Sequence, residues 1–296
     1  MACIILTIDV EEYFQVENFT PFIARDRWGE QTSRLSIQME KIFKILDEKK
    51  ARATFFVLGW IAERHKVVIK RMLSMGHEVA CHGYGHKLIY TQSRDEFRED
   101  IRKSKQILED IIQGPVAGYR APSFSVTENS MWALDILLEE GFAYDSSVFP
   151  IHRDRGGIPG ANRFPYKING RQRSLWEVPI STGRWFNQNI PYAGGGYFRF
   201  LPYWVIKHAV KSLNREGHPA IMYLHPWELD PDQPRVHQAS RLAKFRHYYQ
   251  LEKTEMKLKK LLSDFRFGSI REVFWSKKTK HYEITPQTGF HKTRLS

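Results

Sequence analysis

The chain has 296 residues, enough for one large domain with a sizeable core or for two small domains. Apolar residues make up 42% of it, aromatic residues 14% and charged residues 26%, a balance that excludes a disordered or membrane-embedded chain. The 45 Lys and Arg against 33 Asp and Glu give a net charge of +12, so we expect the surface to attract phosphate, anionic polymers or an anionic membrane face.

The cysteines and the N-terminus indicate the compartment. Cys3 and Cys81 do not make a disulfide framework and are compatible with a reduced compartment. The N-terminus lacks a basic region, and its apolar run is too short for a signal peptide or a membrane helix. We therefore expect a cytoplasmic protein. The basic residues that gather from Arg241 onward favour peripheral contact with the inner membrane, and no motif for a specific nucleic acid is visible.

Short β-branched or aromatic runs alternate with longer segments of helical periodicity, which is typical of βαβ units and a parallel sheet. We expect a closed or nearly closed β/α barrel with its helices outside. The expected strands are Ile4–Ile8, Thr54–Leu58, Glu78–Cys81, Gly118–Tyr119, Ala143–Asp145, Glu177–Pro179 and Ala220–Leu224. The expected helices are Ser33–Lys49, Trp60–Met75, Ser93–Gln113, Ser130–Glu140 and Tyr203–Glu216.

Two regions depart from this alternation. From about Pro150 to Tyr197, clusters of Gly, Pro, Arg and Asn predict long loops with short strands, where active-site walls are usually built. After Pro234 the chain is basic and helical, and Lys253 to Phe265 is amphipathic. We predict a barrel over residues 1–234 and a helical extension over 235–296 that packs on it.

Acidic residues end the first expected strand, which reads Thr7-Ile-Asp9-Val-Glu11-Glu12. Because strand side chains alternate, Asp9 and Glu11 share one face, and Val10 and Glu12 share the other. The C-terminal ends of barrel strands carry catalytic residues, and two like charges so close need a cation or a shared proton. The alternative is a pair of solvated acids.

His82 and His86 follow the expected strand Glu78–Cys81 in the stretch His82-Gly-Tyr-Gly-His86. A spacing of four lets two imidazoles reach one metal if the turn after the strand is helical. Nitrogen and carboxylate ligands suit a borderline cation such as zinc. Alternation points Cys81 away from His82, which favours a packing role. In a chain with 12 histidines the spacing alone is only moderate evidence.

Two more strand ends carry polar residues. Arg120 can orient a carboxylate by a forked hydrogen bond, and Pro122 fixes the backbone so that the following amide is presented rigidly. The apolar run Ala220–Leu224 delivers His225, which titrates near neutrality and can protonate a leaving group. A structural role is the alternative for each residue alone, and it is their order along strand ends that favours a site.

In combination, these motifs resemble those of the polysaccharide deacetylases that share the NodB homology domain, carbohydrate esterase family 4. The chain is most similar to the branch found with exopolysaccharide and exosortase gene clusters, which carries a C-terminal extension. The resemblance covers nearly the whole chain and implies a distorted seven-stranded β/α barrel that removes N-acetyl groups from amino sugars. The motifs are Thr7 to Glu12, Ala53 to Gly59, His82 to His86, Arg120 to Phe124, Tyr144 to Ser147 and Leu224 to Pro226.

Carried over to this chain, the family's roles fall on residues already singled out. The resemblance implies that Asp9 is the catalytic base, that Arg120 holds it and that His225 is the general acid. It also implies that His82 and His86 bind a divalent metal, for which zinc is the expected ion.

Three positions depart from the family pattern. Gly83 stands where the family usually has Ser or Thr after the first histidine, and Ser123 stands where an aromatic residue usually follows the proline. The third departure concerns a metal ligand. The family usually has a second aspartate directly after the base as carboxylate ligand, and here that position is Val10. We expect Glu11 to replace it, because Glu11 shares a face with Asp9 and has a longer reach. The amide of Ser123 is expected to stabilise the oxyanion. The other expected substrate contacts are Phe124, Trp227 and Asp145, the last in support of His225 or Arg120.

The expected substrate is an N-acetylated polysaccharide or a lipid-linked oligosaccharide of exopolysaccharide biosynthesis. An amidase for a small cyclic or ureide substrate is an alternative, because relatives of this barrel do such work and a fold does not fix a substrate. A catalytically inactive basic protein that binds glycans is another, motivated by the net charge of +12 and by Val10.

Overall fold

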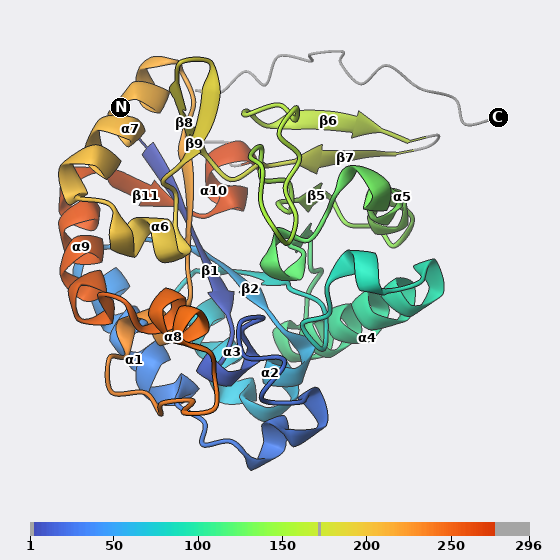
Figure 1. The fold of residues 1–296 in the computed structure, drawn as a ribbon. Coiled ribbons are helices and arrows are strands. Elements are labelled where there is room, and N and C mark those ends of the chain that lie inside the picture. Colours follow the sequence, from blue (N-terminus) through green and yellow to red (C-terminus); the bar gives the residue numbers. More distant parts are fainter. Residues whose placement is uncertain (1–2, 171–172, 276–296) are drawn as a thin grey trace.

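A parallel sheet forms the centre of the computed structural model, which describes residues 3–170 and 173–275 (Figure 1). Its strands follow the order β10-β1-β2-β3-β4-β5-β7-β6, and from β10 to β7 every neighbouring pair is parallel, whereas β6 runs antiparallel to β7. These strands are β1 (Cys3–Val10), β2 (Thr54–Val57), β3 (Glu78–Cys81), β4 (Gly118–Tyr119), β5 (Tyr144–Asp145), β6 (Tyr166–Asn169), β7 (Ser174–Glu177) and β10 (Ala220–Leu224).

Backbone hydrogen bonds bring the two ends of the parallel series together. The amide of Ser181, just beyond β7, donates to the carbonyl of Ile221 in β10 at 3.2 Å. The amide of Tyr223 in β10 donates to the carbonyl of Ala193 at 2.8 Å. The parallel strands of the described residues thus close into a distorted seven-stranded β/α barrel, which confirms the predicted fold class.

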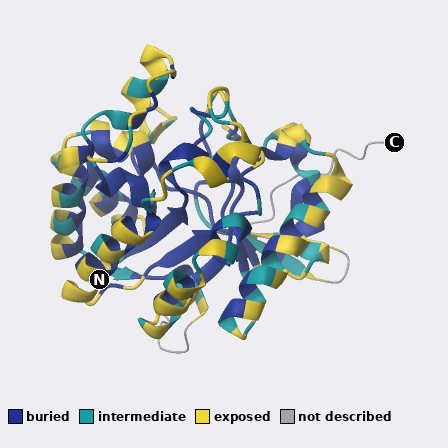
Figure 2. Cartoon of the chain, turned by 90° about the horizontal axis from the view of Figure 1, so that it is seen from below, coloured by how far each residue is buried: buried dark blue, intermediate teal, exposed yellow. Residues whose placement is uncertain are grey.

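The described helices surround the barrel, and Figure 2 shows buried strands at the centre with exposed residues on the outer faces of the helices. The α-helices are α1 (Leu35–Glu48), α2 (Gly59–Arg64), α3 (Lys66–Ser74), α4 (Arg94–Ile112), α5 (Trp132–Glu139), α6 (Gly195–Phe200), α7 (Tyr203–Arg215), α8 (Arg241–Tyr248), α9 (Leu251–Asp264) and α10 (Ile270–Trp275). Short 3-10 helices are η1 (Tyr13–Gln15), η2 (Arg25–Glu30), η3 (Ile89–Thr91), η4 (Pro122–Phe124), η5 (Glu128–Ser130) and η6 (Pro226–Leu229).

Local sequence signals explain β1 and α4, two elements that the sequence predicted closely. Ile4 to Val10 are all buried, as expected of a parallel strand covered on both faces. Helix α4 begins with a capping box: the Ser93 hydroxyl accepts from the amide of Glu96 at 3.2 Å, and the amide of Ser93 donates to the Glu96 carboxylate at 2.7 Å. Its apolar face buries Phe97, Ile101 and Leu108.

Several elements differ from the sequence prediction. The expected helix Trp60–Met75 is divided into α2 and α3, because His65 takes a non-helical conformation (φ −124°, ψ 41°) between them. Strand β7 begins at Ser174 instead of Glu177. The region from Pro150 to Tyr197 contains β6, the hairpin of β8 (Thr182–Trp185) and β9 (Gln188–Pro191), and the start of α6. None of the described helices is both long and apolar enough to cross a bilayer.

The part of the chain after residue 234 packs on the barrel as α8, α9, β11 (Arg266–Gly268) and α10. Strand β11 pairs in parallel with Cys3–Ile5 of β1, so this part also adds a strand to the central sheet. The division into residues 1–234 and 235–296 stays a prediction, and its last residues, 276–296, lie outside the described part.

Lys257 joins α9 to the end of α6. Its buried ammonium donates to the carbonyls of Phe198, Arg199 and Leu201 at 3.2, 2.6 and 2.8 Å. We expect Lys257→Met to lower the free energy of unfolding by about 1–3 kcal/mol, because three acceptors lose their donor. The matched control is Lys259→Met, since Lys259 on the same helix forms an exposed ion pair with the partly exposed Glu255.

Urea denaturation of both variants measures this difference. The Lys259→Met variant should stay within about 0.5 kcal/mol of the parent. Equal midpoints for the two variants would show that Lys257 does not hold α6.

Candidate active site

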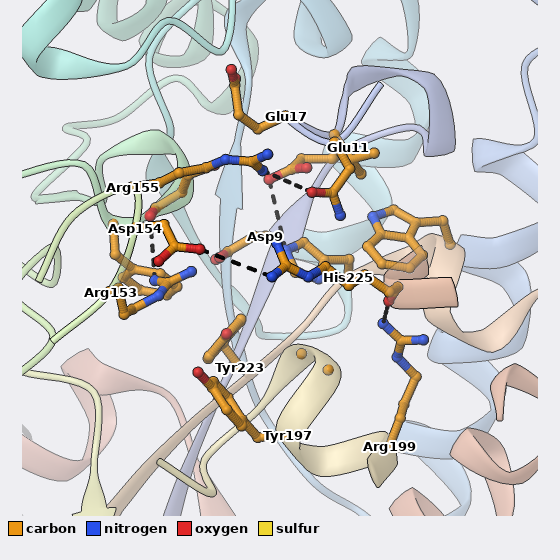
Figure 3. A pocket seen from close by; sticks show the side chains of 18 of the residues that line it. Asp9, Glu11, Glu17, Arg153, Asp154, Arg155, Tyr197, Arg199, Tyr223 and His225 are labelled. Atoms are coloured by element: carbon orange, nitrogen blue, oxygen red, sulfur yellow. Dashed lines mark hydrogen bonds and ion pairs between the residues drawn. The ribbon is translucent and has the colours of Figure 1, made fainter. Parts of the chain in front are cut away.

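A cavity of about 570 Å³ lies at the carboxyl ends of the barrel strands (Figure 3). Its lining includes Asp9 and Glu11 at the end of β1 and His225 directly after β10. His86, after β3, and Ser123, after β4, also line it. The expectation that these strand ends meet at one site is therefore met, although they come from segments far apart in the sequence.

Glu11, His82 and His86 form a compact cluster of ligand atoms that lie within 4.8 Å of one another. Oε1 of Glu11 lies 3.1 Å from Nε2 of His82 and 3.0 Å from Nε2 of His86. All three residues are buried. Val10 points into the core on the opposite face, and Glu11 takes the position beside the histidines that was predicted for the carboxylate.

The hydrogen bonds of His82 fit a cation at this cluster. Its Nδ1 lies 2.8 Å from the carbonyl oxygen of Arg120, which can only accept, so Nδ1 carries the proton. A neutral imidazole then has no proton on Nε2, so two acceptor atoms, Nε2 of His82 and Oε1 of Glu11, face each other at 3.1 Å. A cation bound by both atoms removes this repulsion. Two imidazole nitrogens and one carboxylate, with one ring fixed by a backbone carbonyl, match the donor set of a divalent ion such as zinc.

Asp9 is held by a buried guanidinium. Nη1 of Arg120 donates to Oδ1 of Asp9 at 2.7 Å and to the hydroxyl of Thr7 at 2.6 Å. The other nitrogens of Arg120 donate to the carbonyl and hydroxyl of Ser146 at 3.1 and 2.8 Å. Arg120 also lies over the Phe56 ring at 4.1 Å. These contacts fix the position of Asp9 and place a buried positive charge beside its carboxylate.

His225 presents one ring nitrogen to the cavity. Its Nδ1 lies 2.6 Å from Oε1 of Glu228, and its Nε2 lies 3.8 Å from Oε1 of Glu11. Burial opposes the charged ring, but Glu11, Glu228 and Asp9 outweigh it and raise the pKa of His225 to about 9. The ring also stacks on Trp227, with centroids 5.0 Å apart. Glu228 and Trp227 thus fix the orientation of the His225 ring.

The sequence prediction missed the support behind His225. Oε2 of Glu228 accepts from Nε of Arg199 at 2.8 Å, and both side chains are buried. Arg199 in turn donates to the carbonyls of Arg246, His247 and Tyr249 at 2.8 to 2.9 Å. Glu228, three residues after His225, was a visible signal, whereas α6 gave none for Arg199.

The predicted substrate contacts have different positions. Ser123, Phe124 and Trp227 line the cavity, and Ser123 and Phe124 have positive φ angles of 55° and 53°. Asp145 is fully buried and lies outside the described cavity lining; its Oδ1 accepts from the Ser147 hydroxyl at 2.5 Å. The expectation that Asp145 contacts substrate is therefore corrected. Asp145 holds the Ser147 hydroxyl, which accepts from the amide of Ala121, next to Arg120. The side chain of Arg120 itself contacts Ser146.

Two protein-family models match the chain in adjacent regions. Residues 36–137 match the family described as polysaccharide deacetylase. Residues 146–275 match a domain of unknown function (DUF3473). The first region contains His82, His86 and Arg120, and the second contains His225 and Glu228.

Curated relatives match a shorter part of the chain. A peptidoglycan-N-acetylglucosamine deacetylase of Bacillus cereus is 34% identical over 96 residues, which is 31% of this chain and 35% of that protein. A chitooligosaccharide deacetylase of Sinorhizobium fredii is 32% identical over 98 residues, 33% of this chain and 43% of that protein. The matched region thus spans well under half the length of these relatives.

Solved structures share the fold. A polysaccharide deacetylase structure from Mycobacterium smegmatis has a TM-score of 0.63 at 18% identity and covers 99% of this chain and 95% of its own. The structure of Puue allantoinase has a TM-score of 0.57 at 17% identity and covers 92% of this chain and 87% of its own. At such identities the likeness extends to the fold alone.

Proposed function

We propose that this chain, whose residues 36–137 match the polysaccharide deacetylase family, is a metal-dependent hydrolase that removes N-acetyl groups from N-acetylhexosamine residues. One observation carries this proposal: Glu11, His82 and His86 form a ligand cluster, and Glu11 and His86 of this cluster line the cavity that Asp9 and His225 also line. The relatives named as peptidoglycan and chitooligosaccharide deacetylases support the substrate class.

Each polar residue has a step in this reaction. A divalent ion, with zinc the expected one, would supply Lewis-acid polarisation of the acetyl carbonyl and a lower pKa for the attacking water. Asp9, held by Arg120, takes the proton from that water. The amide of Ser123 faces the oxyanion of the tetrahedral intermediate, and His225 gives its proton to the leaving amine.

The wider setting is also part of the proposal. We assign the substrate to a polysaccharide or a lipid-linked oligosaccharide of exopolysaccharide biosynthesis, handled in the cytoplasm. Basic residues on α8 and α9, such as Arg241, Lys244 and Lys259, support contact with an anionic membrane face.

Metal removal tests this function. We expect a chelator to reduce acetate release from N-acetylglucosamine oligosaccharides to background, and added Zn²⁺ or another divalent ion to restore it. The reason is that the ion is the Lewis acid of the proposed reaction. His82→Ala should lose both bound metal and acetate release. His208→Ala, an exposed histidine on α7, is the matched control and should retain both.

Two outcomes would contradict the proposal. Full acetate release by the chelated, metal-free protein would exclude the metal. Hydrolysis of a cyclic ureide such as allantoin without any acetate release would instead favour the amidase.

A further inference from the structure

One wall of the cavity carries aromatic side chains that the proposed reaction does not use. Tyr197 and Phe200 on α6, Phe245 on α8 and Tyr249 just after α8 all line the cavity, and together they are called the aromatic platform here. Phe200 is 61% exposed and Phe245 is 54% exposed. Large apolar side chains grouped in an open cleft mark a ligand-binding surface, because side chains that stay exposed contribute little burial energy to the folded state.

Three rings of the platform lie next to one another. The Tyr249 ring centroid lies 5.8 Å from that of Phe200 and 4.9 Å from that of Phe245. The planes are tilted by 38° and 44°, so the rings make a shallow curve instead of a closed stack.

The platform is rigid and is connected to the catalytic end of the cavity. Arg199 on α6 donates to the carbonyls of Arg246 and Tyr249, which fixes α6 against the end of α8. The same guanidinium binds Glu228, the partner of His225. Figure 3 shows Tyr197 and Arg199 around the same pocket as His225. A ligand on the platform therefore meets a preorganised surface.

We propose that the aromatic platform is a glycan-binding subsite that stacks a neighbouring sugar ring of the chain whose N-acetylated residue lies between Asp9 and His225. The inference rests on the proposed function and extends it to substrates longer than one sugar. A pyranose presents C–H groups on its faces and hydroxyls at its edge. The ring faces match the first, and the tyrosine hydroxyls and Arg246, which also lines the cavity, match the second.

This occupant follows from the position of the platform. A chain that places one residue at Asp9 must continue along a wall of the same cavity, and α6 and α8 supply an aromatic one. The residues after 234 thereby contribute to substrate binding, through Phe245 and Tyr249.

Chain-length dependence tests the proposal in the intact, metal-loaded protein. The probes are N-acetylglucosamine disaccharide and pentasaccharide, and the readouts are kcat/KM for acetate release and the dissociation constant from calorimetry. We expect the parent to favour the pentasaccharide, and Phe245→Ala and Phe200→Ala each to reduce this preference by about fivefold to tenfold, the size of one lost aromatic contact. Phe245→Tyr should retain it. Leu242→Ala, on the same helix, similarly exposed at 58% and outside the cavity lining, should also retain it.

The outcomes separate this inference from the proposed function. Acetate release with an unchanged length preference in both alanine variants would overturn the subsite alone. Absence of acetate release from the parent would overturn the proposed function, and tighter pentasaccharide binding lost in Phe245→Ala would then still support the subsite. Equal affinity of the parent for both probes would overturn it.

Discussion

Asp9→Asn is expected to reduce kcat for acetate release by about 10²- to 10⁴-fold while the metal stays bound, the range that general-base catalysis contributes. Asparagine keeps the shape of Asp9 and its hydrogen bond from Arg120, but it cannot accept a proton from water. The proposed metal ligands are Glu11, His82 and His86, which the substitution leaves intact. Steady-state kinetics together with metal analysis of the purified variant measure both parts.

The control for Asp9→Asn is Glu12→Gln, because Glu12 follows the same strand and lies on the opposite face. Glu12 is buried, but its carboxylate accepts from the amides of Arg34 and Leu35 and from the Ser33 hydroxyl, away from the cavity. Glu12→Gln should therefore leave kcat within about twofold and lower only stability, through loss of these contacts at the start of α1. If Asp9→Asn retained parental kcat, another group would have to take the proton.

Strand alternation and strand-end position were enough to predict that Glu11 lies beside His82 and His86, and the role of these residues as metal ligands stays a prediction. The face shared by Asp9 and Glu11 follows from a period of two, and parallel strands bring their carboxyl ends to one side of a barrel. The same logic predicted that His86 and His225 lie at the cavity and that Arg120 contacts Asp9. These are relations within or just beyond single strands, where local periodicity is informative.

The parts that sequence could not predict depend on contacts between distant segments. Arg199 sits on a helix of six residues, too short for a clear period, and its partners are carbonyls near residues 246–249. Strand β11 follows Phe265 and pairs with the opposite end of the chain at Cys3. Asp145 ends the strand beside the one that precedes Arg120, yet it contacts Ser147 and does not line the cavity. A position at a strand end narrows the set of candidate site residues, but it does not determine which way each side chain points.

Arg199→Met is expected to lower the free energy of unfolding by about 3–5 kcal/mol, because it leaves a buried carboxylate without its guanidinium partner. The side chains of Arg199 and Glu228 are only 3% and 0% exposed. The substitution also removes the donor for three carbonyls at the end of α8. Urea denaturation followed by tryptophan fluorescence measures the change.

A second arginine provides the control. Arg246 also lines the cavity, but it is 49% exposed, and the nearest carboxylate oxygen of its partner Asp154 lies 3.9 Å away. Arg246→Met should shift the free energy of unfolding by less than about 0.5 kcal/mol, as for other exposed pairs. Similar losses in both variants would show that the buried pair adds nothing beyond an ordinary surface arginine.

The partner substitution separates stability from catalysis. Glu228→Gln should reduce kcat by about 10- to 100-fold, because the carboxylate that orients Nδ1 of His225 becomes an amide, a cost typical of such supporting groups. Its effect on stability should not add to that of Arg199→Met, since both remove the same buried pair, and a double-mutant cycle measures this coupling. An unchanged kcat in Glu228→Gln would mean that stacking on Trp227 alone orients His225. Additive losses of stability would mean that Arg199 and Glu228 act independently. The contacts of Glu228 and Arg199 between His225 and α8 would then be purely structural.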